Sequence, residues 1–185
     1  MAWPDLAATV DTLGAARVTG RFYRHVAAGR DPRTGLGARI SGGRWNPPES
    51  FSTLYLGDGI DTVAREFYRL ARRQGLHPRS FLPRDLHTFK VELEAALDLR
   101  PLSARERLGL SDAELRSDDA SHCQAIGEAA HYLELEGVLA PSATGRGTVL
   151  AVFLPRLRPG SRVQPTDVQR WDEPPPEPEL DATTT

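Results

Sequence analysis

The stretch ISGGRWNPPESFSTLYL, residues 40–56, combines residue types that a simple turn does not require. Gly42 and Gly43 allow backbone conformations and close approaches that other residues forbid. Arg44 offers a planar fork for phosphate or carboxylate, Trp45 a flat stacking face, and Asn46 both a donor and an acceptor. The stretch therefore suits a nucleotide-like ligand. The alternative is a structural loop in which Trp45 fills the core and Arg44 lies on the surface.

The segments around this stretch predict a strand, a long loop and a second strand. Residues 17–26, RVTGRFYRHV, mix β-branched and aromatic residues and indicate a strand. Residues 29–50 form a long loop rich in Gly, Pro and Arg, and loops of that length in compact domains are usually functional or disordered. The apolar run STLYLG, residues 52–57, is typical of a short strand.

The clearest helix follows these strands. Its apolar residues recur at helical spacing and form one stripe, which consists of Ile60, Val63, Ala64, Phe67, Leu70 and Ala71. Asp58 or Asp61 is placed to cap its start. Four arginines are expected on the opposite, solvated face, namely Arg65, Arg69, Arg72 and Arg73.

Glu66 stands apart from the other charged residues of this helix. It lies one turn from both Val63 and Leu70, at the edge of the apolar stripe. A carboxylate in that position costs desolvation free energy unless a partner pairs with it. Glu66 could therefore stabilise a developing cation or act as a base. The alternative is an ion pair with a nearby arginine.

The rest of the chain mixes strands and helices without a regular βαβ rhythm, which predicts an α+β fold. A leading helix with Leu6, Val10 and Leu13 falls within residues 1–16, and residues 87–97 alternate like a half-buried strand. Capping-box patterns predict helices that start near residues 103, 111 and 121. The third pairs Ser121 with Gln124, and Gly137 is its expected stop. Residues 137–143 and 147–155 indicate the last strands, and residues 172–185 a disordered tail rich in Pro and Glu.

Composition limits the possible partners and compartments. The chain has 185 residues, 39% hydrophobic and 26% charged, with a net charge of −2, so no global positive field would attract nucleic acid or an anionic membrane. Cys123 is the single cysteine, which excludes an internal disulfide and fits a reducing compartment. No His or Cys spacing suggests a metal site. With no signal peptide or transmembrane run in the sequence, we expect a cytoplasmic protein.

Three further residues are candidates for a binding site. Arg24 follows Tyr23 in a strand-like run, and alternation would place it on the same face as Phe22, pointing inward. A buried arginine needs an anion, supplied by the protein or by a ligand. Tyr55 lies on a short apolar strand, where a core tyrosine is the ordinary alternative. Ser142 follows Pro141, where a turn serine is the default.

Taken together, these segments resemble the RES domain family, the toxin half of bacterial RES–Xre toxin–antitoxin pairs. The matching stretches run from about residue 20 to residue 155 and are FYRHV, GLGARISGGRWNPP, LYL, AREF, CQAIGEAA and GVLAPSA. GGRWNP is the most specific of them. The resemblance implies that residues 17–160 form a domain like that of ADP-ribosyltransferase toxins, a split β-sheet with flanking helices around a cleft for NAD.

The resemblance also implies an activity and its residues. Such domains degrade NAD, as a substrate and without a further cofactor, by cleaving the bond between nicotinamide and ribose. The catalytic positions fall on Arg24, Tyr55, Glu66 and Ser142. The substrate-binding positions fall on Arg44, Trp45 and Asn46. The partner would be an Xre-type antitoxin in a hetero-oligomer, and any contact with nucleic acid would be the antitoxin's.

Two functional alternatives and one departure from the family pattern remain. The acceptor of ADP-ribose could be water, phosphate or a target protein, and the chain could instead be a silent module that binds NAD or its antitoxin. The family usually has a small residue, often Gly, after NPP, whereas this chain has Glu49. That change puts the geometry of the loop in doubt more than the chemistry.

Overall fold

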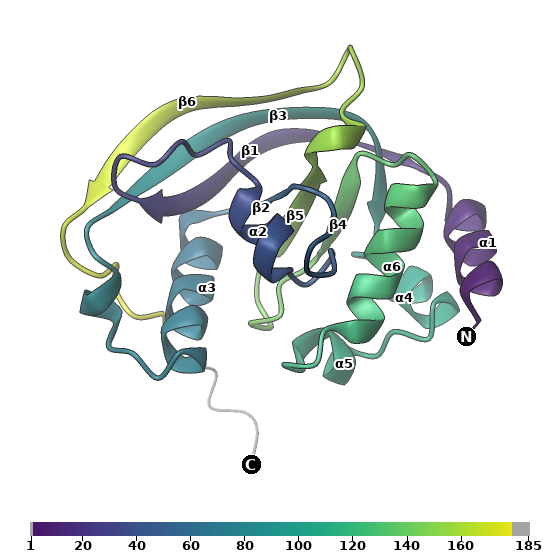
Figure 1. The fold of residues 1–185 in the computed structure, drawn as a ribbon, viewed down its shortest axis with the longest axis horizontal. Coiled ribbons are helices and arrows are strands. Elements are labelled where there is room, and N and C mark those ends of the chain that lie inside the picture. Colours follow the sequence, from purple (N-terminus) through teal and green to yellow (C-terminus); the bar gives the residue numbers. More distant parts are fainter. Residues whose placement is uncertain (1, 179–185) are drawn as a thin grey trace.

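The computed structural model describes residues 2–178, which form one sheet with helices at both of its ends (Figure 1). The strands are β1 (Ala16–Ala27), β2 (Thr53–Gly57), β3 (Arg84–Asp98), β4 (Gly137–Pro141), β5 (Thr148–Phe153) and β6 (Arg162–Trp171). The helices are α1 (Trp3–Leu13), α2 (Leu36–Ser41), α3 (Ile60–Arg73), α4 (Leu102–Arg107), α5 (Asp112–Arg116) and α6 (Ser121–Tyr132). Short 3₁₀ turns lie at Pro78–Phe81 and Leu154–Arg156. The α+β class predicted from the sequence is confirmed.

The sheet bends back on itself. Its strand order is β1-β2-β5-β4-β3-β6, and β1 also pairs with β3 along almost its whole length. All pairings are antiparallel except the short parallel pairing of β3 with β4. The long strands β1, β3 and β6 form an arch, with α3 under one end and α1, α4, α5 and α6 gathered at the other (Figure 1).

Two hydrophobic clusters hold this arrangement together. One lies between the helices at the α6 end and the sheet, and it includes Trp45, Ile126 and Phe153. The other fills the inside of the bent sheet, where Phe22, Leu56 and Phe89 meet. Because alternate residues of each strand face opposite sides, the same strands serve both clusters. The loop that holds Trp45 is thereby fixed to the core.

Several local predictions were wrong. The predicted loop 29–50 contains the short helix α2, and β6 was not predicted at all. Gly59, not Asp58 or Asp61, is the N-cap of α3, without a side-chain cap. No side chain caps α4 or α6 either, so the boxes predicted near residues 103 and 121 do not form, whereas the box at Ser111 does. α6 ends at Tyr132, and Gly137 begins β4 instead.

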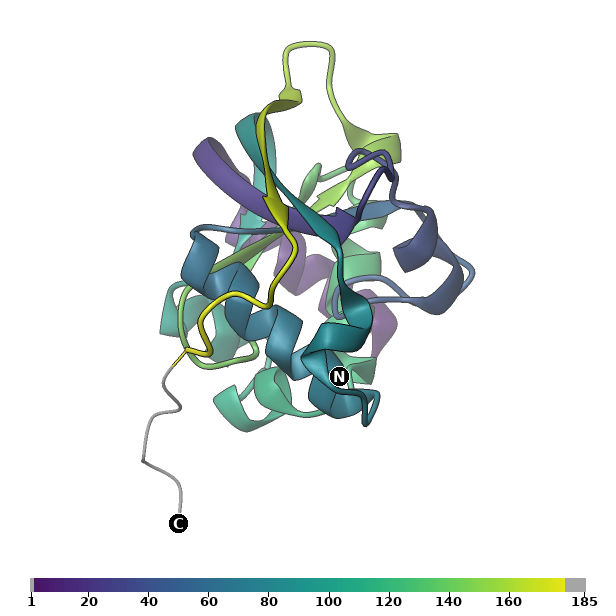
Figure 2. The ribbon, with the colours of Figure 1, turned by 90° about the vertical axis from the view of Figure 1, so that its left-hand side faces the viewer.

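The chain beyond β6 passes alongside α3 (Figure 2). Residues 172–178 contain no helix or strand, and the Tyr68 hydroxyl of α3 donates a hydrogen bond of 2.8 Å to the carbonyl of Pro175. The remainder of the predicted disordered tail, residues 179–185, lies outside the described residues. Within residues 2–178 no helix is long and apolar enough to cross a membrane.

Candidate functional site

A cavity of about 790 Å³ opens between β1, the loop 37–45, β2, α3 and the start of α6. Five of the seven residues singled out from the sequence line it, namely Arg24, Arg44, Trp45, Tyr55 and Glu66. Ser142 stands in its wall, between the lining residues Pro141 and Ala143. Asn46 is fully buried behind the wall. The fold therefore gathers residues that are up to 118 positions apart around one cavity.

The Tyr55 hydroxyl holds the loop that forms one wall of the cavity. It accepts a hydrogen bond from the Trp45 backbone N–H and donates one to Asn46 Oδ1, both at 2.8 Å. Burial raises the pKa of this hydroxyl above its ordinary value, so it remains a neutral donor. The Asn46 amide donates in turn to the carbonyl of Ala38 at 2.8 Å. The Trp45 side chain is only 1% exposed and belongs to the core, as in the structural alternative considered for this loop.

Two residues of α6 that sequence reasoning did not assign to the site support this loop from its other side. Gln124 donates a 2.9 Å hydrogen bond from Nε2 to the carbonyl of Gly43 and also lines the cavity. Gly127, one turn later, lies so close that an added Cβ would be 1.9 Å from the Trp45 carbonyl oxygen. Gly43 is equally constrained, because its Cβ would lie 2.3 Å from the Tyr55 hydroxyl. The spacing of Gln and Gly in QAIG, three residues apart on one helix face, is the signal that could have revealed them.

Arg24 brings an uncompensated positive charge to the cavity. Its Nη1 donates a 3.1 Å hydrogen bond to the Pro32 carbonyl, which is neutral. Burial, together with the neighbouring Arg84, lowers the pKa of Arg24 to about 10, against the opposing effect of Asp31. Asp31 itself is exposed and pairs with Arg33. An anionic ligand would supply the charge that this pair of arginines lacks.

Arg44 lines the same cavity from the loop that follows α2. Its Nη2 donates a 2.7 Å hydrogen bond to the Ser117 carbonyl, while its buried Nη1 has no partner within residues 2–178. A buried guanidinium nitrogen without an acceptor carries a desolvation cost of about 1–3 kcal/mol. The alternative of a purely surface arginine is therefore wrong for this position.

Glu66 and Ser142 are in direct contact. Ser142 is 1% exposed, and its hydroxyl donates a 2.7 Å hydrogen bond to Glu66 Oε1. The same hydroxyl accepts a 3.1 Å bond from the Thr144 N–H and lies 2.7 Å from Thr144 Oγ1. Since no arginine or lysine forms an ion pair with Glu66 within residues 2–178, the structural alternative of an ion pair does not apply. The serine fixes the direction of the carboxylate, which faces the cavity.

The described part of the chain offers no group of three or more His, Cys, Asp or Glu side chains that could hold a metal ion. The cavity itself presents guanidinium, carboxylate, phenol and amide groups. Arginines suit anions, and a positioned carboxylate suits a developing cation.

Comparison with known proteins identifies the family. The model of the RES domain matches residues 15–174, most of the chain. The chain belongs to the RES domain family. It is 40% identical over 153 residues to proteins named NAD(+) phosphorylase MbcT from Mycobacterium bovis and Mycobacterium tuberculosis, covering 82% of each chain.

A solved structure shares the fold of this RES domain. It is described as the crystal structure of the M. tuberculosis MbcT–MbcA toxin–antitoxin complex, and the match has a TM-score of 0.83 at 37% identity. The match covers 90% of this chain and 92% of that one. The RES match extends beyond residue 160 and includes all of β6, which pairs with β3 from Glu92 to Arg84.

Glu49 is the position at which this RES chain departs from the pattern expected of the family. Its φ is 56°, in the left-handed region that favours glycine. The side chain is exposed and does not line the cavity. The departure therefore affects the backbone of the loop and leaves the chemical groups of the cavity in place.

Proposed function

We propose that this protein is the toxin of a toxin–antitoxin pair and degrades NAD by phosphorolysis of the bond between nicotinamide and ribose. The observation that carries the proposal is the pairing of Ser142 with Glu66 at a cavity whose other wall holds Arg24 and Arg44. The name and the 40% identity of the mycobacterial relatives support it. The matching toxin–antitoxin structure supports the partner.

The charges of the cavity agree with the charges of this reaction. Cleavage expels neutral nicotinamide and leaves positive charge on the ribose, as in glycoside cleavage through an oxocarbenium-like transition state. The Glu66 carboxylate, oriented by Ser142, would stabilise that charge and accept a hydrogen bond from a ribose hydroxyl. Arg24 would hold the pyrophosphate through its uncompensated guanidinium. No general acid is needed, since the leaving group departs without a proton.

The role of the GGRWNPP loop is to shape the cavity. Arg44 lines the cavity, so its guanidinium would meet an anionic or carbonyl oxygen of the substrate. Trp45 and Asn46 would contribute indirectly, because their side chains are buried and their contacts fix the position of the loop. The Tyr55 ring faces the cavity and its hydroxyl is committed to the loop, which leaves the ring for contact with nicotinamide or its ribose.

The proposal includes the finer features implied by the family resemblance. The bent sheet around the cavity is an ADP-ribosyltransferase-like split sheet, and NAD is its substrate. The antitoxin is an Xre-type protein that assembles with this chain in the cytoplasm and carries any contact with nucleic acid. The net charge of −2 supports that division of roles, because the chain has no global positive field of its own.

The test is nicotinamide release from NAD by the purified chain without antitoxin, followed by NMR with and without inorganic phosphate. We expect phosphate-dependent release, with a ribose phosphate ester seen by ³¹P NMR. Glu66→Gln keeps the size of the side chain and removes the charge, so we expect a loss of at least about 100-fold in kcat. Full activity in a folded Glu66→Gln protein would refute the assignment. Release without phosphate dependence would indicate hydrolysis, and label on a protein would indicate a transferase.

A further inference from the structure

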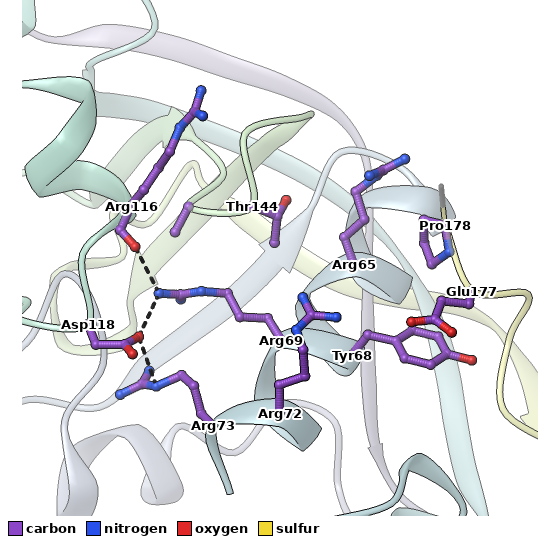
Figure 3. Close-up of a pocket in the computed structure, with 11 residues that line it drawn as sticks. Arg65, Tyr68, Arg69, Arg72, Arg73, Arg116, Asp118, Thr144, Glu177 and Pro178 are labelled. Carbon is purple, nitrogen blue, oxygen red and sulfur yellow. Dashed lines mark hydrogen bonds and ion pairs between the residues drawn. The ribbon is translucent and has the colours of Figure 1, made fainter. Parts of the chain in front are cut away.

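A second cavity, of about 470 Å³, lies beside the first and is lined by arginines (Figure 3). Four of them come from α3 and the fifth from α5, and they are Arg65, Arg69, Arg72, Arg73 and Arg116. Two carboxylates, of Asp118 and Glu177, line the same cavity. The arginines therefore outnumber the acids, although the chain as a whole has a net charge of −2.

The ion pairs within the cavity leave part of this positive charge without an acidic partner. Asp118 accepts from Arg69 at 3.1 Å and from Arg73 at 3.3 Å, so one carboxylate serves two guanidinium groups. Arg72 and Arg116 form no side-chain hydrogen bond or ion pair with any residue between 2 and 178. The guanidinium of Arg116 lies over Gly145, where an added Cβ would be 3.2 Å from Cζ. These arginines can accept a small anion without breaking an ion pair.

This cavity adjoins the first cavity on the side where Ser142 contacts Glu66. Arg69, Arg73, Asp118 and Ala143 line both cavities. Thr144 lines the arginine cavity, and its hydroxyl lies 2.7 Å from the Ser142 hydroxyl that donates to Glu66. These hydroxyl contacts link the arginine cavity to the carboxylate proposed to face the ribose.

We propose that the arginine cavity binds inorganic phosphate, the acceptor of the reaction. This inference rests on the proposed function. Hydrogen phosphate held there would form a P–O–C bond to the anomeric carbon while the bond from that carbon to nicotinamide breaks. The electron pair of the broken bond leaves with nicotinamide, which becomes neutral, and the phosphate proton stays on the ester or passes to solvent. Neither an oxidant nor a reductant is required.

Inorganic phosphate fits this cavity better than the pyrophosphate of NAD does. Arg24, on the β1 side of the first cavity, already provides an uncompensated charge there. The arginine cavity lies on the other side of Glu66, along α3. Arg24 in the first cavity, and Arg72 and Arg116 in the arginine cavity alone, thus offer charge-assisted, bidentate hydrogen bonds to two phosphate-bearing substrates.

The test uses the double variant Arg72→Gln/Arg116→Gln, because these two residues line the arginine cavity alone. Arg162→Gln is the matched control, an exposed arginine of β6 that lines neither cavity. KM for phosphate and KM for NAD are measured separately by nicotinamide release at constant ionic strength. Phosphate binding is also measured by calorimetry without NAD.

We expect KM for phosphate to rise roughly tenfold in the double variant while KM for NAD and the Arg162→Gln control stay unchanged. Calorimetry should show phosphate binding to the wild-type chain and weaker binding to the double variant. An unchanged KM for phosphate, a rise confined to KM for NAD, or no phosphate binding by the wild-type chain would overturn the inference. Absence of NAD cleavage by the wild-type chain would instead refute the proposed function, and the calorimetric result would still decide the phosphate site.

Discussion

We expect Tyr55→Phe to destabilise the protein far more than the loss of one hydroxyl usually does. The hydroxyl makes two hydrogen bonds of 2.8 Å, with the Trp45 N–H and with Asn46 Oδ1. Trp45 is 1% exposed and Asn46 is 0% exposed, so water cannot replace the lost partner. Leaving a buried polar group unsatisfied costs about 1–3 kcal/mol, so two such groups give a loss of about 2–6 kcal/mol in the free energy of unfolding.

Urea denaturation at pH 7, followed by tryptophan fluorescence and by circular dichroism, measures this loss. Tyr68→Phe is the control, since it removes the same atom from a partly exposed tyrosine that makes one hydrogen bond, to the Pro175 carbonyl. There we expect a loss below about 1 kcal/mol, because solvent can satisfy the remaining carbonyl. Equal losses in the two variants would refute the view that Tyr55 holds the loop.

Two other predictions concern the loop and the buried histidine. Glu49 has a φ of 56°, so Glu49→Gly should leave stability unchanged or raise it by up to about 1 kcal/mol, whereas Glu49→Val should lower it, as thermal unfolding can measure. Burial, with Arg84 and Arg24, lowers the pKa of His25 to about 3 in the folded state. An unfolded histidine titrates near 6.5, so the unfolded state binds the proton first as the pH is lowered. The free energy of unfolding therefore decreases as the pH falls below about 6.5, by up to about 1.4 kcal/mol per pH unit. Urea titrations between pH 6.5 and 5 should show a smaller slope for His25→Gln than for the wild-type chain.

Elements with a strong local pattern could be predicted from the sequence, and elements without one could not. The apolar stripe of α3 and the alternation in β3 are local signals, and both elements form. Nine of the ten residues of β6 are exposed or partly exposed, so its sequence lacks the alternation that marks a buried strand. No residue of α2 is buried, and its six residues carry no apolar stripe.

Local patterns were misleading where tertiary contacts compete for the same side chain. The spacing of Ser121 and Gln124 is that of a capping box, but Gln124 donates to the Gly43 carbonyl in the loop that lines the first cavity. At Ser111 the capping box forms, because Glu114 accepts from Ser111 with Oε2 while its Oε1 contacts His122 Nδ1 at 3.0 Å. The sequence could place Glu66 near Ser142 only through the family resemblance, because that contact joins residues 76 positions apart.

The arrangement of α3 explains why one helix can serve two substrates. Residues three and four apart lie on the same face, so Glu66 is followed along that face by Arg69 and Arg73, which line both cavities. The sequence predicted a solvated face for the four arginines of α3, which was wrong for Arg65, whose side chain is 10% exposed, and for Arg69, whose side chain is only 16% exposed. Asp118, 49 residues later, lies over it. No pattern within the helix could reveal the contact with Asp118. This contact makes a row of helix arginines part of the wall of a cavity beside the proposed reaction centre.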